Sequence, residues 1–232
     1  MKRWLQILLL FLVPALSRAE EPWPAVLNRM PLERGTTQLD RTNCVQVMLS
    51  AFQSNGVIKA LVFMPGATDE FYMFRRAQAR LSTPAPTLMD AVSALTNQTR
   101  IRVTFKTPFL VLHADPDSLT PKLTIRHAPT AEKLGKRRFL PHVEFNDKDW
   151  DSVQPLLKKH LGADVKPWRF SIDAYHFYRS ALSGWDLSGL EALEAVALAS
   201  RTCATVERRS FLGISGTLIQ FEGEQAVEKS TH

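Results

Sequence analysis

The chain has 232 residues, of which 45% are hydrophobic and 22% are charged, and its formal net charge at pH 7 is +6. This composition is typical of a globular protein and excludes a disordered or fibrous chain. The mild positive charge gives no strong electrostatic reason to expect nucleic acid as a partner. The length suits one large domain or two small ones.

The N-terminus has the pattern of a secretory signal peptide over residues 1–19. Lys2 and Arg3 precede an apolar run over residues 4–16, and a small-x-small cleavage site ends at Ala19. The run is shorter than the ~20 residues that cross a bilayer. We therefore expect an exported chain, periplasmic or extracellular, with no transmembrane segment after cleavage. A retained N-terminal anchor is the alternative.

The remaining chain divides by pattern into four segments. Residues 20–35 are rich in proline and lack periodicity, so we expect an exposed lead-in. Residues 36–128 are expected to form an α+β domain with two helix–strand units. Residues 129–223 are expected to form a second α+β domain or a continuation of the first. Residues 224–232 are a polar tail that should be flexible.

Three stretches combine an amphipathic helix with strands. In the clearest one, Thr87 and Asp90 predict a capping box at the start of a helix over residues 88–97. Similar patterns predict helices over residues 43–54 and 189–201. The strands expected after these three helices cover residues 57–64, 101–105, 109–113, 205–212 and 214–221. Helices followed closely by strand pairs favour an α+β fold, with each apolar stripe packed on a mainly antiparallel sheet.

Two of these stretches are "LSTPAPTLMDAVSALTNQTRIRVTFKTPFLVLH" (residues 81–113) and "LSGLEALEAVALASRTCATVERRSFLGISGTLIQF" (residues 187–221). Both resemble the short N-terminal domain of secretins and TonB-dependent receptors, in which a helix with an alanine–leucine pair is followed by strands of alternating aliphatic residues. The family pattern is occupied by Leu81, Leu88, Ala91, Leu95, Thr99, Ile101, Val103 and Val111 in the first stretch, and by Leu187, Leu190, Ala192, Leu193, Ala197 and Thr202 in the second.

The resemblance implies an interaction module of the bacterial envelope, with a protein or an envelope component as its partner and with no catalytic residues. Such a module would bind through an exposed strand edge or sheet face. Arg100 and Arg102 are the first candidate binding residues, because they alternate with Ile101 and Val103 on the expected core face.

An alternative function rests on "PHVEFNDKDWD", residues 141–151. His142 and Glu144 would share one face of a strand, and Asp147 could add an oxygen ligand. These residues could centre a metal-assisted hydrolase. Further ligands would then come from elsewhere in the fold, from His113, His127 or His176.

A simpler interpretation is that Asp147, Asp149 or Asp151 caps the helix that follows. The sequence contains no G-x-G-x-x-G, no phosphate-binding loop, no H-E-x-x-H and no paired C-x-x-C. The leading expectation is therefore a non-enzymatic protein without a cofactor or a metal.

The middle of the chain carries the remaining predictions. Residues 133–138 form a basic run. We expect either a solvated loop or a binding site for phosphate or an anionic membrane surface. Residues 168–172 read as a strand and residues 174–181 as a helix that stops at Gly184.

Cys44 and Cys203 are the two cysteines, and they would either form a disulfide in an oxidising compartment or remain as two buried thiols.

Overall fold

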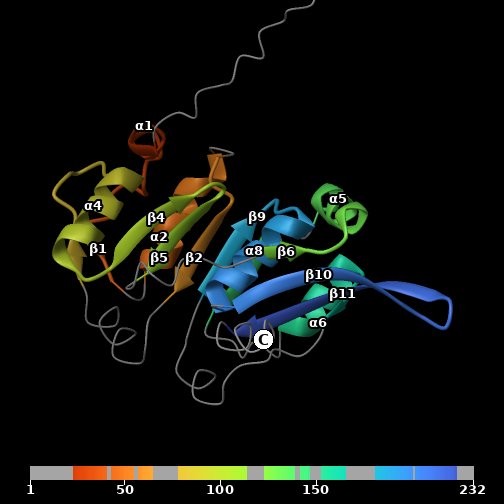
Figure 1. The fold of residues 1–232 in the computed structure, drawn as a ribbon. Coiled ribbons are helices and arrows are strands. Elements are labelled where there is room, and N and C mark those ends of the chain that lie inside the picture. The colour runs from red at the N-terminus through yellow and green to blue at the C-terminus, as the bar shows by residue number, and fades with distance from the viewer. Residues whose placement is uncertain are drawn as a thin grey trace, which may run out of the picture.

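Two β-sheets and a helix between them organise the protein (Figure 1). The computed structural model describes residues 23–40, 43–54, 57–64, 78–113, 123–138, 142–146, 153–165, 181–200 and 202–223. Over these ranges the predicted α+β class is confirmed. The expected signal peptide and C-terminal tail lie outside the described residues. Within the described ranges, every helix is too short or too polar to cross a bilayer.

The larger sheet has five strands in the order β4-β5-β2-β9-β7. Its strands are β2 (Ala60–Met64), β4 (Arg102–Lys106), β5 (Phe109–His113), β7 (His142–Asn146) and β9 (Ala181–Trp185). The β2–β5 pair is parallel, and the other pairs are antiparallel. Because β2 pairs with β9, the expected segments 36–128 and 129–223 share one sheet, and the second continues the first.

The smaller sheet has four strands in the order β6-β10-β11-β8. These are β6 (Leu123–Ile125), β8 (Asp164–Val165), β10 (Thr202–Phe211) and β11 (Ile214–Gly223). The hairpin of β10 and β11 is antiparallel, as predicted, but β6 and β8 run parallel to their neighbours. Parallel neighbours need long crossovers. Helices separate these strands along the chain, so this sheet is mixed, although its longest pairing is the antiparallel hairpin.

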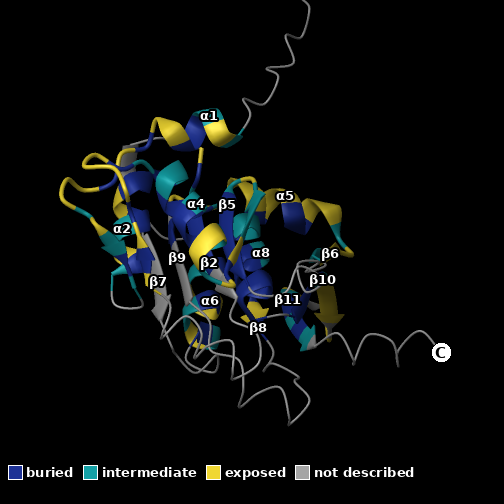
Figure 2. Cartoon of the chain, turned by 90° about the vertical axis from the view of Figure 1, so that its left-hand side faces the viewer, coloured by how far each residue is buried: buried dark blue, intermediate teal, exposed yellow. Residues whose placement is uncertain are grey.

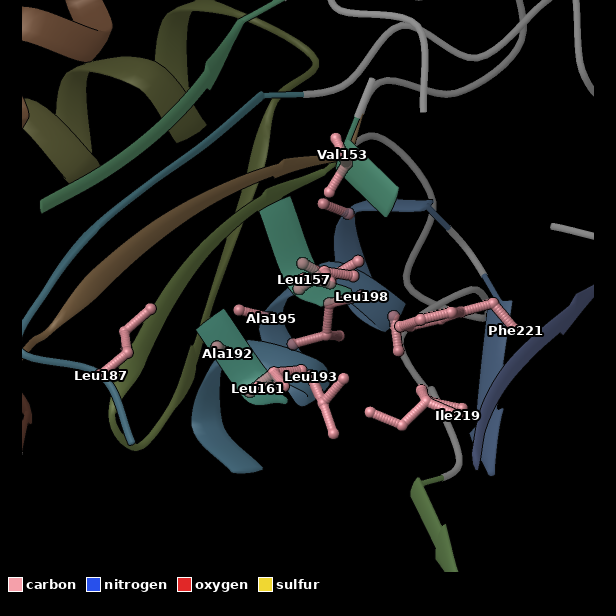
Figure 3. Packing of buried hydrophobic residues seen from close by; sticks show 14 of the residues in the cluster. Val153, Leu157, Leu161, Leu187, Ala192, Leu193, Ala195, Leu198, Ile219 and Phe221 are labelled. Atoms are coloured by element: carbon pink, nitrogen blue, oxygen red, sulfur yellow. The ribbon is translucent and has the colours of Figure 1, made fainter. Parts of the chain in front are cut away.

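The helix between the two sheets, α8 (Gly189–Ser200), is buried on nearly every side (Figure 2). It belongs to one apolar cluster with Val62 and Phe109 from the larger sheet and Ile219 and Phe221 from the smaller (Figure 3). A helix that is apolar all round is stable only inside a protein. The single apolar face predicted for α8 therefore understates its burial, because a sheet lies on each side of it.

Two further helices complete the layer around α8. They are α5 (Ala128–Lys136) and α6 (Val153–Leu161). The stripe of Val153, Leu157 and Leu161 on α6 is buried. Gly189 lets α8 approach α5 closely, because a Cβ on this residue would lie 2.8 Å from the carbonyl oxygen of Leu134.

The opposite face of the larger sheet is covered by a second apolar cluster (Figure 1). Its helices are α1 (Trp23–Asn28), α2 (Cys44–Ser50), the short 3-10 helix η1 (Ala51–Ser54) and α4 (Leu88–Gln98), and nearby β1 (Gln38–Leu39) pairs with β3 (Ala79–Arg80). Along β2, Leu61 belongs to this cluster, whereas Ala60 and Val62 belong to the cluster around α8. Successive side chains of a strand alternate between faces, so both faces of the sheet are buried.

The α4 helix matches its prediction closely. Thr87 and Asp90 form the capping box, with the Thr87 backbone N–H donating to Asp90 Oδ2 at 2.7 Å. At the other end, Thr99 Oγ1 donates to the carbonyl oxygen of Leu95 at 2.6 Å. The predicted stripe, including Leu95, is buried. The cap and the buried stripe are both encoded by residues of the helix and its ends, which explains why α4 could be predicted from local sequence.

Residues 20–35, predicted as an exposed lead-in, are partly buried where the structure describes them. Residues 23–28 form α1, and Leu27 and Met30 are buried. The Trp23 ring stacks on the Phe105 ring of β4, with centroids 4.8 Å apart. These contacts with residues distant in sequence overcome the weak local helix signal.

Two predictions in the middle of the chain are corrected. Residues 181–184, expected to end a helix, belong to β9, because pairing with β2 and β7 decides their conformation. The basic run at residues 133–138, expected as a loop, begins on the last turn of α5, where its lysines complement the helix dipole. The strand expected at residues 168–172 and most of the helix at residues 174–181 lie outside the described residues.

Leu95→Ala should lower the free energy of unfolding by about 2–5 kcal/mol, because it leaves a cavity in the second cluster. Leu95 is 2% exposed. Chemical denaturation measures the difference. Asn97→Ala, at an exposed position on the same helix, is the matched control and should stay within about 0.5 kcal/mol of the wild type. An equal effect of both variants would contradict the packing of α4.

Candidate functional site

The β4 strand forms one edge of the larger sheet, and β5 is its only paired neighbour among the described residues. Lys106 and Phe109 are register partners at the hairpin end. In an antiparallel ladder every second residue turns its backbone N–H and C=O away from the neighbouring strand. Counting from that closing pair, these residues are Val103 and Phe105. Their backbone groups offer an edge on which another strand can pair.

The predicted binding residues lie at the start of this edge. Arg100 and Arg102 are both exposed, whereas Ile101 between them is buried, so the predicted alternation holds. Arg102 also has a structural contact, since its Nη1 donates to the carbonyl oxygen of Thr96 at 3.3 Å. Thr96 lies in the last turn of α4, where a positive charge complements the helix dipole. The arginines therefore give this end of the edge a positive charge.

Side-chain contacts hold the rest of β4 in place. Lys106 Nζ lies 2.9 Å from Glu194 Oε1 on α8. Thr104 Oγ1 and His113 Nε2 lie 2.8 Å apart across the β4–β5 pair. On the other face, Phe105 is fixed by its stack on Trp23. The edge is thus held in place by contacts on both of its faces. The sequence pattern did not reveal these partners, because they are distant along the chain.

The residues of the alternative metal site are only partly placed. His142 and Glu144 lie on β7, at the other edge of the larger sheet. The side chains of both residues, and all of Asp147, lie outside what the structure describes. The same holds for the proposed caps Asp149 and Asp151.

Two of the histidines suggested as additional ligands have other contacts. His127 is the N-cap of α5, and its Nδ1 accepts a hydrogen bond from the Thr130 backbone N–H at 3.2 Å. His113 is buried and contacts Thr104. His176 lies outside the described ranges. Within those ranges, no three His, Cys, Asp or Glu side chains gather with the geometry of a metal site.

Two open hollows lie near α2 and α4, and both are lined mainly by polar groups. The larger, of about 470 Å³, lies between residues 33–38 and α2. The smaller, of about 180 Å³, lies between Arg80 and the exposed side of α4. Small-molecule sites are usually concave and mainly apolar, so neither hollow has the character of a ligand pocket.

The two cysteines are separate buried thiols, so the disulfide considered from the sequence is not formed. Cys44 lies on α2 in the second cluster, where its Sγ is 3.8 Å from Met48 Sδ. Cys203 lies on β10 of the smaller sheet, next to Ala204, which belongs to the cluster around α8. Burial, and then the negative charge of Asp40, raise the pKa of the Cys44 thiol to about 12.

In the native protein Cys44 should therefore react slowly with a thiol reagent at neutral pH, because the thiolate is the reactive form. After unfolding in guanidinium without a reducing agent, the same reagent should titrate two thiols per chain. Finding none in the unfolded chain would reveal a Cys44–Cys203 bridge and contradict this arrangement.

A partly buried ion pair joins the larger sheet to the start of α8. Lys59 Nζ donates to Glu191 Oε1 at 2.8 Å, and the Ser188 backbone N–H donates to Glu191 Oε2 at 2.7 Å. Burial raises the pKa of Glu191, but the hydrogen bonds from Lys59 and Ser188 and the positive charge of Lys59 outweigh it, so the pKa lies below its ordinary value. The sequence contains the Ser188–Glu191 spacing of a capping box, but no local pattern indicates the lysine.

Glu191→Gln keeps the capping geometry and removes the charge, and it should cost about 0.5–1 kcal/mol of stability at pH 7. A carboxyl whose pKa is lowered by folding stabilises above its unfolded pKa of about 4.3, and the contribution is lost as pH falls through the folded value. The difference between wild type and variant, measured by denaturation, should therefore vanish at low pH. Glu132→Gln removes the exposed pair with Lys136 and serves as the control. A difference that persists at low pH would contradict the charge effect.

In comparisons with known proteins, no family model matches the chain, and no curated protein or solved structure is detectably similar to it.

Proposed function

We propose that this protein is an exported, non-enzymatic binding protein that receives an extended segment of a protein or envelope component on the β4 edge. The observation that carries the proposal is the position of β4, whose outer side has no strand partner among the described residues. Strand addition at a sheet edge uses backbone hydrogen bonds for affinity and side-chain contacts for specificity.

The charge at this edge favours an acidic segment. Arg100 and Arg102 are exposed at the end where β4 begins. Opposite charges across an interface increase the association rate and fix the register of the partner. A strand with carboxylates opposite these two positions would therefore pair in preference to a neutral or basic one.

The resemblance to the N-terminal domain of secretins and TonB-dependent receptors supports the same class of function. Its first stretch, residues 81–113, corresponds to α4 packed beside β4 and β5, so the resemblance falls on the element that supplies the open edge. The signal-peptide pattern of residues 1–19 supports export. Both points are part of the proposal.

Val103→Pro tests the edge. Proline removes the backbone N–H that Val103 turns outward, and an edge strand tolerates proline where that group faces solvent. A photo-reactive amino acid at position 102 should cross-link to a partner in the cells that make the protein, and Val103→Pro should abolish the cross-link while lowering the melting temperature only slightly.

The matched control is Thr104→Pro, which removes a backbone donor directed at β5 and should destabilise the fold by about 1–3 kcal/mol. A second photo-reactive position, Glu132 on the exposed side of α5, should give no cross-link to the same partner. Equal cross-linking from positions 102 and 132, or cross-linking unaffected by Val103→Pro, would refute binding at this edge.

A further inference from the structure

The hairpin of β10 and β11 extends beyond the rest of the molecule (Figure 1). Its register is continuous from Thr202↔Gly223 to Phe211↔Ile214. Near the body, residues such as Val206 and Ile219 are buried against α8. From residue 208 to residue 216, every position whose exposure is described is exposed. This distal part of the hairpin, residues 208–216, is the tip.

The turn at the end of the tip holds a leucine in an unfavourable place. Leu212 and Gly213 have φ values of 49° and 81°, the left-handed conformation of a type I′ turn. Asn, Asp or Gly is preferred at the first of these positions, and a branched apolar residue is strained there. Leu212 is also 87% exposed, against 40% for Val57 and 42% for Ile125. Backbone strain and exposure of an apolar side chain thus coincide at one residue, which points to a function.

Positive charge surrounds the tip just behind this leucine. Arg208 and Arg209 are consecutive on β10, so their side chains leave opposite faces of the hairpin. Residues 208–217 contain no Asp or Glu. The nearest carboxylate, Glu207, is shared by Arg209 at 2.6 Å and Arg126 at 3.6 Å. One carboxylate therefore faces two guanidinium groups, and the tip keeps a net positive charge.

We propose that the tip docks on an anionic lipid bilayer, with Leu212 inserted below the headgroups and Arg208 and Arg209 at the level of the phosphates. The spacing fits this arrangement, because the three residues from Arg209 to Leu212 span about 10 Å at ~3.4 Å per residue. Apolar groups of interfacial elements reach about 5–10 Å into the headgroup boundary. Half of the backbone groups of a two-stranded hairpin face outward, so the tip stays at the level of the headgroups, where water can satisfy these groups.

The shape of the tip favours a bilayer over a flat protein surface. The two arginines leave both faces of the hairpin, so the charge lies around the leucine instead of on one side of it. A uniform anionic surface contacts both faces at once, whereas a protein partner would present its complement to one. This proposal concerns a different surface from the β4 edge and does not depend on the proposed function.

Leu212→Asn gives a sharp test, because asparagine suits the left-handed turn better than leucine does. Binding of the full chain to vesicles of equal parts phosphatidylglycerol and phosphatidylcholine is measured by co-sedimentation. Leu212→Asn should weaken this binding about tenfold while leaving the melting temperature equal or higher. Comparing full chains keeps any contribution of residues 4–16 the same in every sample.

Two further comparisons separate the contribution of the positive charge to vesicle binding from that of the apolar side chain. Arg208→Gln should weaken binding to the anionic vesicles about fivefold and leave binding to pure phosphatidylcholine unchanged. Val57→Thr and Arg34→Gln are matched controls that remove an exposed apolar group and an exposed charge elsewhere, and neither should alter binding.

Three results would overturn the proposal. The first is that Leu212→Asn binds vesicles as well as the wild type does. The second is that Val57→Thr loses as much vesicle binding as Leu212→Asn. The third is that the wild type binds no vesicles but forms a concentration-dependent dimer, which Leu212→Asn abolishes. None of these outcomes bears on cross-linking at position 102, so the two proposals succeed or fail separately.

Discussion

The burial of α8 between two sheets is the constraint on which the other layers depend. The larger sheet presents one face to α8 and the other to α1, α2 and α4, while the smaller sheet covers the far side of α8. Alanine at positions 192, 195, 197 and 199 keeps this helix narrow, so the sheets come close enough to share one apolar cluster. A bulky or charged side chain at any of these positions would separate layers that interiors normally pack at crystal-like density.

Polar contacts set where α8 begins and how it is oriented. Ser188 and Glu191 cap its first turn, and Lys59 draws the same carboxylate toward the start of β2. One turn further along, Glu194 reaches Lys106 on β4. A helix that is apolar all round has little to fix its rotation, since a buried apolar surface has no directional preference. These two ion pairs supply that direction, and the second also ties the proposed binding edge to the core.

Much of the local structure could be predicted from the sequence, whereas its arrangement could not. The capping box at Thr87 and the stripe ending at Leu95 define α4 because the signals lie within a few residues. The assignment of Ala181 to β9 depends on pairing with Phe63, more than a hundred residues earlier, and no local pattern carries that information. The helix at Trp23 likewise depends on its stack with Phe105.

The exposure of Arg102 followed from alternation, but the position of β4 at a sheet edge required the strand order. At Leu212 a local signal was present: Gly213, which follows it directly, marks a turn, and an apolar residue in such a turn is unusual.

The pairing of β2 with β9 has a consequence for how the chain folds. Ala60 to Phe63 have their β9 partners at residues 181–184, so a large part of the chain must be closed into a loop before this pair forms. Loop closure costs entropy before the contact rewards it, and proteins rich in such distant contacts fold slowly. During synthesis, the N-terminal half emerges with the apolar face of β2 and β5 uncovered, because α8 follows much later in the sequence. The native core can therefore form only after nearly the whole chain has left the ribosome, and until then the nascent protein exposes surface on which a chaperone can act.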